Sequence, residues 1–330
     1  MYPVYLTAYH GSKLEQLIKR TFGMLESCCL CPRRCQVNRL KNKIGFCKTG
    51  LNPKVYSFMP HHGEEPPISG ERGSGAIFFS NCNMACVYCQ NYEFSQLGEG
   101  REVDFLELAR LMVQLQDMGC HNINLVTPTH VMPQILKALS LAIPKGLKIP
   151  LVYNTSGYEL VEIIKLLDGI VDIYLPDMRY ADNNMAIKYS SAAGYPEYNQ
   201  EVVGEMHKQV GVASIDNKGI INRGLVIRHL VLPNNISGTD EVMKFIAQEL
   251  CENTYISLMS QYLPCHKAGQ IKELSHRVTY KEYEDAKQIM QKYALNNGWF
   301  QESHGLERFA GVNIKPVFKE GCNRANKNKI

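Results

Sequence analysis

The sequence of 330 residues predicts an α/β protein, an incomplete (β/α)6 TIM-like barrel that follows an N-terminal cysteine-rich lobe. Six short apolar runs alternate with helix-like segments after residue 75, and parallel strands need such helical crossovers. Only about 190 residues carry this alternation, whereas eight strand–helix units need about 250 residues. No Gly-x-Gly-x-x-Gly follows the first apolar run, so a dinucleotide-binding fold is not supported.

The expected elements follow from apolar runs and helical periodicity. Strands are expected over residues 75–80, 122–126, 149–153, 170–175, 225–232 and 255–259. Asp104 is expected to cap the first helix of the repeat, because Glu107 follows three residues later and apolar side chains then recur with helical spacing. Further helices are expected over residues 131–141, 159–167, 183–193, 199–209, 240–250 and 280–295.

We divide the chain into three parts. Residues 1–72 form the cysteine-rich metal-binding lobe, residues 73–300 the partial barrel, and residues 301–330 an extension with a polar, basic tail. The chain is 45% apolar and 21% charged, with a net charge of +4, which is typical of a globular protein. No apolar run approaches the roughly 20 residues that span a bilayer. The N-terminus does not resemble a signal peptide, so we expect a cytoplasmic protein that does not enter membranes. Nucleic-acid binding is not expected, because no basic stripe is interleaved with aromatic residues.

The twelve cysteines are unevenly placed, with five between residues 28 and 47 and three between residues 82 and 89. In a reducing compartment such clusters indicate metal binding. Cys82, Cys86 and Cys89 follow the first expected strand directly. Iron–sulfur clusters are held by thiolates, normally one for each iron. Three cysteines therefore leave one iron of a [4Fe–4S] cluster open, which indicates a catalytic cluster.

A second group offers four ligands at Cys28, Cys31, Cys35 and Cys47, with Cys29 left over. Four thiolates close a structural zinc site. They also hold a second [4Fe–4S] cluster, and the spacing does not separate the two. The third interpretation is a set of free buried thiols.

Polar residues follow the expected strands at the edge where ligands bind in parallel sheets. They include the stretches 127–130, 154–157, 176–179 and 260–262, and Arg228 and His229 lie within the fifth strand. The loop with His61, His62, Glu64 and Glu65 either lines a substrate channel or is a polar surface loop, and we favour the surface loop. This edge is therefore the expected mouth of an active site.

The Cys82–Cys89 loop after the first strand of a βα series resembles the radical S-adenosylmethionine superfamily. Within it, the chain looks most like iron–sulfur proteins similar to pyruvate formate-lyase activating enzyme, on residues 61–66, 122–130, 153–158, 172–177 and 228–233. The resemblance implies a [4Fe–4S] cluster on Cys82, Cys86 and Cys89, with S-adenosylmethionine on the fourth iron. A one-electron reductant such as flavodoxin or ferredoxin would then cleave S-adenosylmethionine to methionine and a 5′-deoxyadenosyl radical, which abstracts a substrate hydrogen.

Three functions stay open, two within this resemblance and one of a different class. The first is activation of a glycyl-radical enzyme, which makes the substrate a protein. The second is modification of a small molecule or of another protein side chain. The third is a metal-binding interaction module without turnover, against which the repeat with polar strand ends argues.

The resemblance also implies contacts to S-adenosylmethionine. Tyr88 stands where family members place an aromatic side chain near the adenine, with ordinary core packing as the alternative. Thr127 and Thr129 replace the family's Gly-Gly-Glu-Pro-like stretch, and His130 beside them is either a ligand or a neighbour of a helix cap. The other expected contacts are Asn154 and Ser156 to ribose or carboxylate, Arg179 to the methionyl carboxylate in place of a lysine, and His229, which is either a contact or a core histidine.

Overall fold

A single ten-stranded sheet forms the centre of the computed structural model, which describes residues 3–301. The strands follow the order β10-β9-β8-β6-β5-β4-β2-β1-β3, and β7 pairs with β8. Seven neighbouring strands run parallel: β2 (Ser74–Phe79), β4 (Ile123–Val126), β5 (Leu151–Thr155), β6 (Ile173–Pro176), β8 (Ile221–Leu230), β9 (Tyr255–Met259) and β10 (Gly298–Phe300). Across the described residues the two ends of this path do not pair, so the predicted incomplete barrel is confirmed.

The six predicted strands correspond to β2, β4, β5, β6, β8 and β9, and four more strands were not predicted. The additional strands are β10, the antiparallel β1 (Lys54–His61) and β3 (Arg101–Glu102), and β7 (Ser214–Ile215). Three of these have only two or three residues, which is too short for a periodic pattern. β1 shows no clean alternation, because its side chains pass from three consecutive buried positions to a half-buried run.

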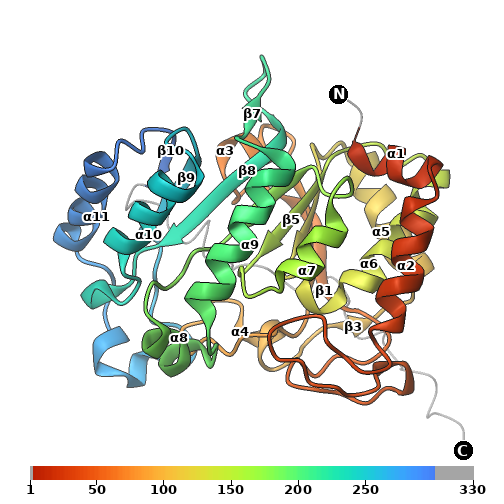
Figure 1. Cartoon of the computed structure of the whole chain (residues 1–330), viewed down its shortest axis with the longest axis horizontal. Helices are drawn as coiled ribbons and strands as arrows, with labels where there is room; N and C mark the ends of the chain where they lie inside the picture. The colour runs from red at the N-terminus through yellow and green to blue at the C-terminus, as the bar shows by residue number, and fades with distance from the viewer. Residues whose placement is uncertain (1–2, 302–330) are drawn as a thin grey trace, which may run out of the picture.

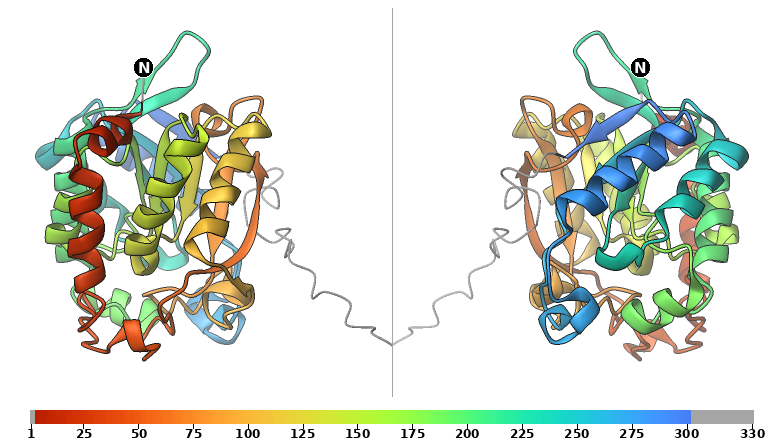
Figure 2. Two further views of the ribbon diagram at one scale, coloured as in Figure 1. Left: turned by 90° about the vertical axis from the view of Figure 1, so that its right-hand side faces the viewer. Right: turned by 90° about the vertical axis from the view of Figure 1, so that its left-hand side faces the viewer.

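Helices cover the outside of the sheet (Figures 1 and 2). The predicted ones are α5 (Phe105–Asp117), α6 (Met132–Ala142), α7 (Val161–Ile164), α8 (Asn183–Ser190), α9 (Tyr195–Val210), α10 (Thr239–Phe245) and α11 (Tyr280–Lys292). The predicted cap of α5 is confirmed, since the Asp104 carboxylate accepts the Glu107 N–H at 2.7 Å. Two short helices, α3 (Pro66–Ser69) and α4 (Tyr92–Ser95), lie in the loops that follow β1 and β2. Among the described residues no helix is long and apolar enough to cross a membrane.

The N-terminal region is tied to the barrel at both of its ends. Helix α1 (Val4–His10) buries Tyr5, whose hydroxyl donates to the Ile149 carbonyl at 2.8 Å, and α2 (Lys13–Gly23) packs on α6. Because β1 also joins the sheet, the irregular part is residues 24–53, which we name the cysteine-rich segment. It lies at the same end of the molecule as α4 and α8, the lower end in Figure 1.

The division of the chain at residues 72 and 300 stays a prediction. Residues 302–330, which hold almost all of the expected basic extension, lie outside the described residues.

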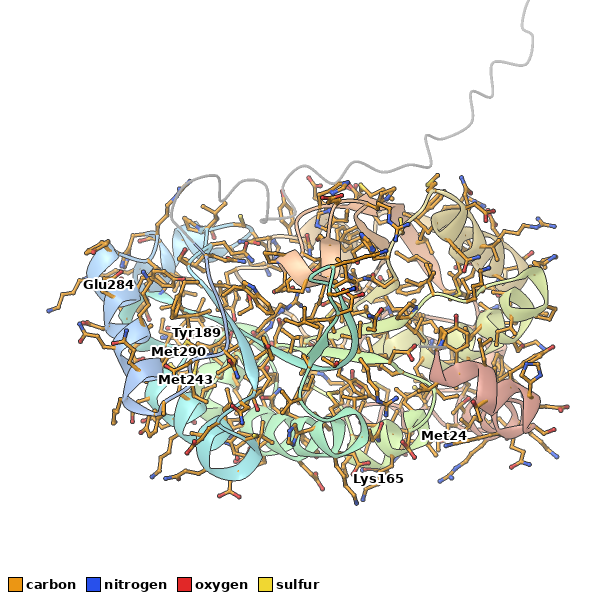
Figure 3. All side chains as sticks on the ribbon, turned by 90° about the horizontal axis from the view of Figure 1, so that it is seen from above. Met24, Lys165, Tyr189, Met243, Glu284 and Met290 are labelled. Carbon is orange, nitrogen blue, oxygen red and sulfur yellow. The ribbon has the colours of Figure 1, made fainter. Side chains whose placement is uncertain are left out.

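The core lies between the sheet and its helices, and side chains fill this space (Figure 3). Every residue of β2, β4, β5 and β6 is buried, as expected for parallel strands covered on both faces. Met243 of α10 and Met290 of α11 pack inward, whereas Lys165 is exposed. Since the strands themselves are buried, the polar side chains of the expected active site lie at their carboxyl ends.

Candidate active site

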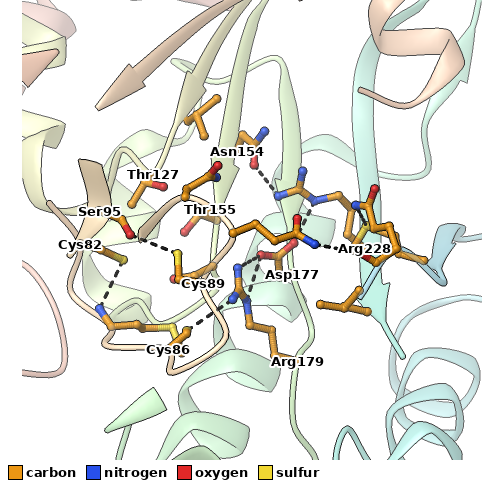
Figure 4. A pocket seen from close by; sticks show the side chains of 18 of the residues that line it. Cys82, Cys86, Cys89, Ser95, Thr127, Asn154, Thr155, Asp177, Arg179 and Arg228 are labelled. Atoms are coloured by element: carbon orange, nitrogen blue, oxygen red, sulfur yellow. Dashed lines mark hydrogen bonds and ion pairs between the residues drawn. The ribbon is translucent and has the colours of Figure 1, made fainter. Parts of the chain in front are cut away.

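One cavity of about 170 Å³ lies where the parallel strands end and reaches into the barrel (Figure 4). The loop after β2 contributes Cys82, Cys86 and Cys89 to its lining. The ends of β4, β5 and β6 contribute Thr127, Asn154, Ser156 and Arg179. The sheet order thus brings together residues that lie almost 100 positions apart in the sequence.

The loop that carries the three cysteines is fastened to the last turn of α8. The backbone N–H of Ala85 donates to the Ser190 carbonyl at 3.0 Å, and that of Val87 donates to the Tyr189 carbonyl at 2.8 Å. Asn81 opens the loop with a positive φ of 71°, a conformation that asparagine tolerates better than most residues. These contacts hold the loop so that its three thiols share one cavity.

Each of these thiols has a hydrogen-bond partner. The Cys86 Sγ accepts from Arg179 Nη1 at 3.4 Å and from the Ser190 hydroxyl at 3.0 Å. The Cys82 Sγ accepts the Met84 N–H at 3.4 Å, and the Cys89 Sγ lies 3.1 Å from the Ser95 Oγ. Burial, followed by the charge of Cys86, raises the pKa of Cys89 to about 11, so ionised thiols here need a cationic partner.

No three Cys, His, Asp or Glu side chains in residues 3–301 are placed to hold a single metal ion. The thiolates of an iron–sulfur cluster bind different iron atoms and therefore stand apart. The donor set is three hydrogen-bonded thiols on one cavity, with Cys86 buried and Cys82 and Cys89 half-buried, and it fits such a cluster.

Four charged side chains alternate across the cavity in the order Arg179, Asp177, Arg228 and Glu64, and we name them the charge chain (Figure 4 shows the first three). Successive members are 2.6, 2.8 and 3.3 Å apart. Burial alone would raise the pKa of Asp177, but the two guanidinium groups outweigh burial and hold this pKa below its ordinary value. The charge chain runs from the Cys86 thiol into the barrel, and within it each buried charge has a partner of opposite sign.

The positions of Glu64 and Glu65 contradict one prediction that we made from the sequence. We favoured a polar surface loop, yet both side chains are buried and line the cavity. The Glu64 carboxylate accepts from Asn124 at 3.1 Å and from Asn154 at 3.2 Å. Burial raises the pKa of Glu65 to about 7. The loop folds inward because Arg228, on a strand far along the sequence, supplies the partner for Glu64.

Five of the predicted S-adenosylmethionine contacts line the cavity: Tyr88, Thr127, Asn154, Ser156 and Arg179. The Tyr88 hydroxyl lies 2.5 Å from that of Tyr180, and this contact fixes the ring of Tyr88 within the cysteine loop. The Ser156 hydroxyl is buried without a hydrogen-bond partner among the described residues. An unsatisfied buried hydroxyl is costly, which makes Ser156 a natural contact for a ligand.

Arg179 is more constrained than its sequence position indicated. Its Nε and Nη2 donate to the same Asp177 oxygen at 3.1 and 2.6 Å, and its Nη1 faces Cys86. The Arg179 guanidinium, which we expected to pair with a methionyl carboxylate, therefore already contacts Asp177 and Cys86.

Thr129 and His229 do not line the cavity. The Thr129 hydroxyl donates to Glu159 at 2.5 Å inside the core. The His229 Nδ1–H donates to the Met178 carbonyl at 2.7 Å, and Nε2 accepts from the Thr239 hydroxyl at 3.0 Å. Both ring nitrogens are satisfied, so the structure favours the core histidine of our two alternatives.

The second cysteine group lines a separate, smaller cavity of about 10 Å³, at which Cys28, Cys31, Cys35 and Cys47 meet. Burial raises the pKa of Cys31 to about 12, and the charges of Cys47 and Cys28 add to this effect. The four predicted ligands of the cysteine-rich segment are thus brought together.

Comparison with known proteins identifies the family. Residues 76–246 match the model of the radical SAM superfamily. The chain is 31% identical over 293 residues to an uncharacterized protein of Methanocaldococcus jannaschii, covering 86% of this chain and 80% of that protein.

Two solved structures are similar at 13% identity each. One is HydG, a maturase of the [FeFe]-hydrogenase, with a TM-score of 0.47 over 72% of this chain and 53% of that chain. The other is methylornithine synthase, with a TM-score of 0.45 over 74% of this chain and 72% of that chain. This chain thus spans about half the length of HydG. Since the family model covers more than half of its residues, the chain belongs to the radical SAM superfamily, whose members use a [4Fe–4S] cluster and S-adenosylmethionine.

Proposed function

We propose that this chain is an enzyme that holds a [4Fe–4S] cluster on Cys82, Cys86 and Cys89 and binds S-adenosylmethionine beside it. The observation that carries the proposal is the shared cavity, which is lined by the three thiols and by the polar ends of three strands. When bound, the cluster and S-adenosylmethionine supply the 5′-deoxyadenosyl radical that removes a hydrogen atom from the substrate.

The residues of the chain have distinct parts in this proposal. Tyr88, Thr127, Asn154 and Ser156 line the space for S-adenosylmethionine, and the free Ser156 hydroxyl offers it a hydrogen bond. Arg179 is a positioning residue, because its guanidinium donates to the Cys86 sulfur while Asp177 fixes its orientation. A one-electron reductant such as flavodoxin or ferredoxin is the partner that this chemistry needs.

Two substrate classes remain within the proposal. Activation of a glycyl-radical enzyme, as in proteins similar to pyruvate formate-lyase activating enzyme, is supported by the open barrel, which leaves a side at which a protein can dock. A small polar molecule is supported by Glu64 and Arg228, whose charges lie inside the barrel at the cavity. The charged interior favours the small polar molecule or a polar side chain.

The test is anaerobic purification, counting of iron and sulfide, and measurement of 5′-deoxyadenosine formed under reducing conditions. We expect the Cys86→Ala variant to form none above background, because a cluster ligand and the partner of Arg179 are both lost. The matched control is Cys251→Ala, whose half-buried thiol follows α10 outside the cavity. Product at the parent rate in Cys86→Ala would refute the proposal.

The substrate classes are separated by adding candidates to the same assay. A glycyl-radical enzyme that gains a radical signal only with this protein supports activation. A small molecule that increases 5′-deoxyadenosine formation supports the second class, and this increase should disappear in Arg228→Leu.

A further inference from the structure

His130 faces a different site from the one its sequence position indicated. It follows β4 beside Thr127 and is 1% exposed, but it does not line the cavity of Cys82, Cys86 and Cys89. Instead it lines the small cavity of the cysteine-rich segment, together with Cys28, Cys31, Cys35 and Cys47. A barrel residue thus completes the wall of a cavity that the N-terminal segment otherwise builds.

The two ring nitrogens of His130 have different surroundings. Nε2 lies 2.8 Å from the carbonyl oxygen of Ser80, and because a carbonyl only accepts, Nε2 carries the hydrogen. Nδ1 is buried and has no hydrogen-bond partner among the described residues. Ligating histidines typically donate the N–H of their other nitrogen to a backbone carbonyl in this way. The ring therefore keeps a bare Nδ1 lone pair, which is the form that binds a metal.

Polar groups lie beside the thiols around this cavity. Arg39 is buried in the segment, and its Nη1 lies 3.9 Å from the Cys28 Sγ. The backbone N–H groups of Arg33 and Thr49 face the thiols of Cys31 and Cys47. Cys35 differs, since its half-buried Sγ accepts the Phe46 N–H at 3.4 Å and packs against Gly45.

We propose that Cys28, Cys31, Cys47 and the Nδ1 of His130 bind one zinc ion, with Cys35 outside the ligand set. Three thiolates and one imidazole are an established tetrahedral ligand set for structural zinc. The proposal replaces one predicted cysteine with a histidine from the barrel, and it does not depend on the proposed radical function.

The size of the cavity favours one ion over a second cluster. It holds about 10 Å³, close to the volume of a single water probe. In residues 3–301 these side chains are not yet arranged around a single ion, so zinc binding requires them to move inward. The segment allows this adjustment, because over residues 24–53 its only helix is the 3-10 turn Arg39–Lys41.

Zinc at this position would clamp the N-terminal segment to the active-site end of the barrel. Ser80, which accepts from the His130 ring, lies two residues before Cys82. Arg33, between two of the cysteines, donates from Nε to the Asn83 carbonyl at 3.0 Å, and its guanidinium lies 3.7 Å from the centre of the Phe46 ring. The ion would therefore hold in place two contacts to the loop that carries the catalytic cysteines.

The test uses the full chain with Cys82, Cys86 and Cys89 replaced by alanine, so that metal at the catalytic loop does not contribute. The protein is purified from medium that contains zinc and iron, and both metals are counted. We expect one zinc and less than one iron per chain. X-ray absorption at the zinc edge should show three sulfur ligands near 2.3 Å and one nitrogen near 2.0–2.1 Å.

Variants then assign the ligands. His130→Asn should lose zinc or change its shell, whereas Cys35→Ser should keep one zinc with three sulfur ligands and one nitrogen. His207→Asn, on α9 and away from this cavity, is the matched histidine control and should keep the parent content. Because the absorption spectrum is read on the protein with His130 and all four cysteines intact, misfolding of a variant does not decide the outcome.

Four results would overturn the proposal. They are about four irons per chain in the protein without the catalytic cysteines, no bound metal at all, a zinc shell of four sulfurs, or loss of zinc in Cys35→Ser. A failure of S-adenosylmethionine cleavage in the parent protein would refute the proposed function and leave this zinc site unaffected.

Discussion

His229 illustrates, at the scale of single residues, how burial decides the role of a side chain. It is fully buried in β8, with one ring nitrogen donating and the other accepting. Burial lowers its pKa to about 4. The neutral ring is therefore part of the folded core, while the unfolded chain takes up a proton near pH 6.5.

This shift predicts acid sensitivity. A group whose folded pKa is depressed contributes stability above its unfolded pKa and loses that stability as the pH falls toward the folded pKa. From pH 6.5 to pH 4 the parent should lose about 3 kcal/mol more unfolding free energy than His229→Gln, from about 1.4 kcal/mol for each pKa unit. Urea unfolding under anaerobic conditions at several pH values measures the difference. His10→Gln, at an exposed histidine, should track the parent, and parallel profiles for all three proteins would show that His229 does not titrate as described.

Sequence reasoning at this scale found the chemistry but not the orientation of side chains. The spacing of Cys82, Cys86 and Cys89 predicted three residues on one cavity, because a short loop after a strand leaves them little freedom. Thr127 and Thr129 lie two positions apart, yet only Thr127 faces the cavity, since its positive φ of 62° turns the chain after β4. The sequence contains no signal for that turn.

Short turns after the strands shape the site at the scale of elements. Gly157 follows β5 with a positive φ of 73°, and a methyl group on its Cα would lie 2.7 Å from the Asp177 carbonyl oxygen and clash with the Asn199 amide. Asn199 of α9 in turn donates to that carbonyl at 2.9 Å. The turn thus fixes the backbone at Ser156 and Asp177, which directly follow the neighbouring strands β5 and β6.

Gly157→Ala should therefore disturb the site as well as the fold. Gly146→Ala is the matched control, because Gly146 also has a positive φ but nothing within 4 Å of the added methyl group. The control should lose about 1–2 kcal/mol of unfolding free energy from backbone strain alone. Gly157→Ala should lose more, and its KM for S-adenosylmethionine in the 5′-deoxyadenosine assay should rise several-fold. Equal stabilities and an unchanged KM would mean that the turn relaxes without cost.

Element prediction succeeded where the pattern was long and failed where partners are distant in sequence. The cap at Asp104 and the buried run of β2 are local features, and both are present. The inward fold of Glu64 depends on Arg228, 164 residues away, and β10 pairs with β9 through only three residues. Neither the distant ion pair nor the short edge strand leaves a periodic signal in the sequence.

At the scale of the whole molecule, one end of the sheet collects every proposed site. The cysteine loop, the charge chain and the cysteine-rich segment all lie where the parallel strands end, while β7 projects from the opposite end (Figure 1). The strands that present the site, β4, β5 and β6, are buried on both faces. The site therefore rests on the part of the sheet with the most extensive packing.

This arrangement predicts a gradient of hydrogen exchange across the sheet. Amides of β5 should exchange only through global unfolding, because every side chain of β5 is buried and both neighbouring strands are paired with it. Amides of β7 and β10 should exchange faster, since both residues of β7 and two of the three residues of β10 are exposed. Exchange followed by peptic digestion and mass spectrometry, with a fully exchanged unfolded sample as reference, measures the gradient. Protection of residues 298–300 equal to that of residues 151–155 would mean that β10 belongs to the same cooperative unit as the centre of the barrel.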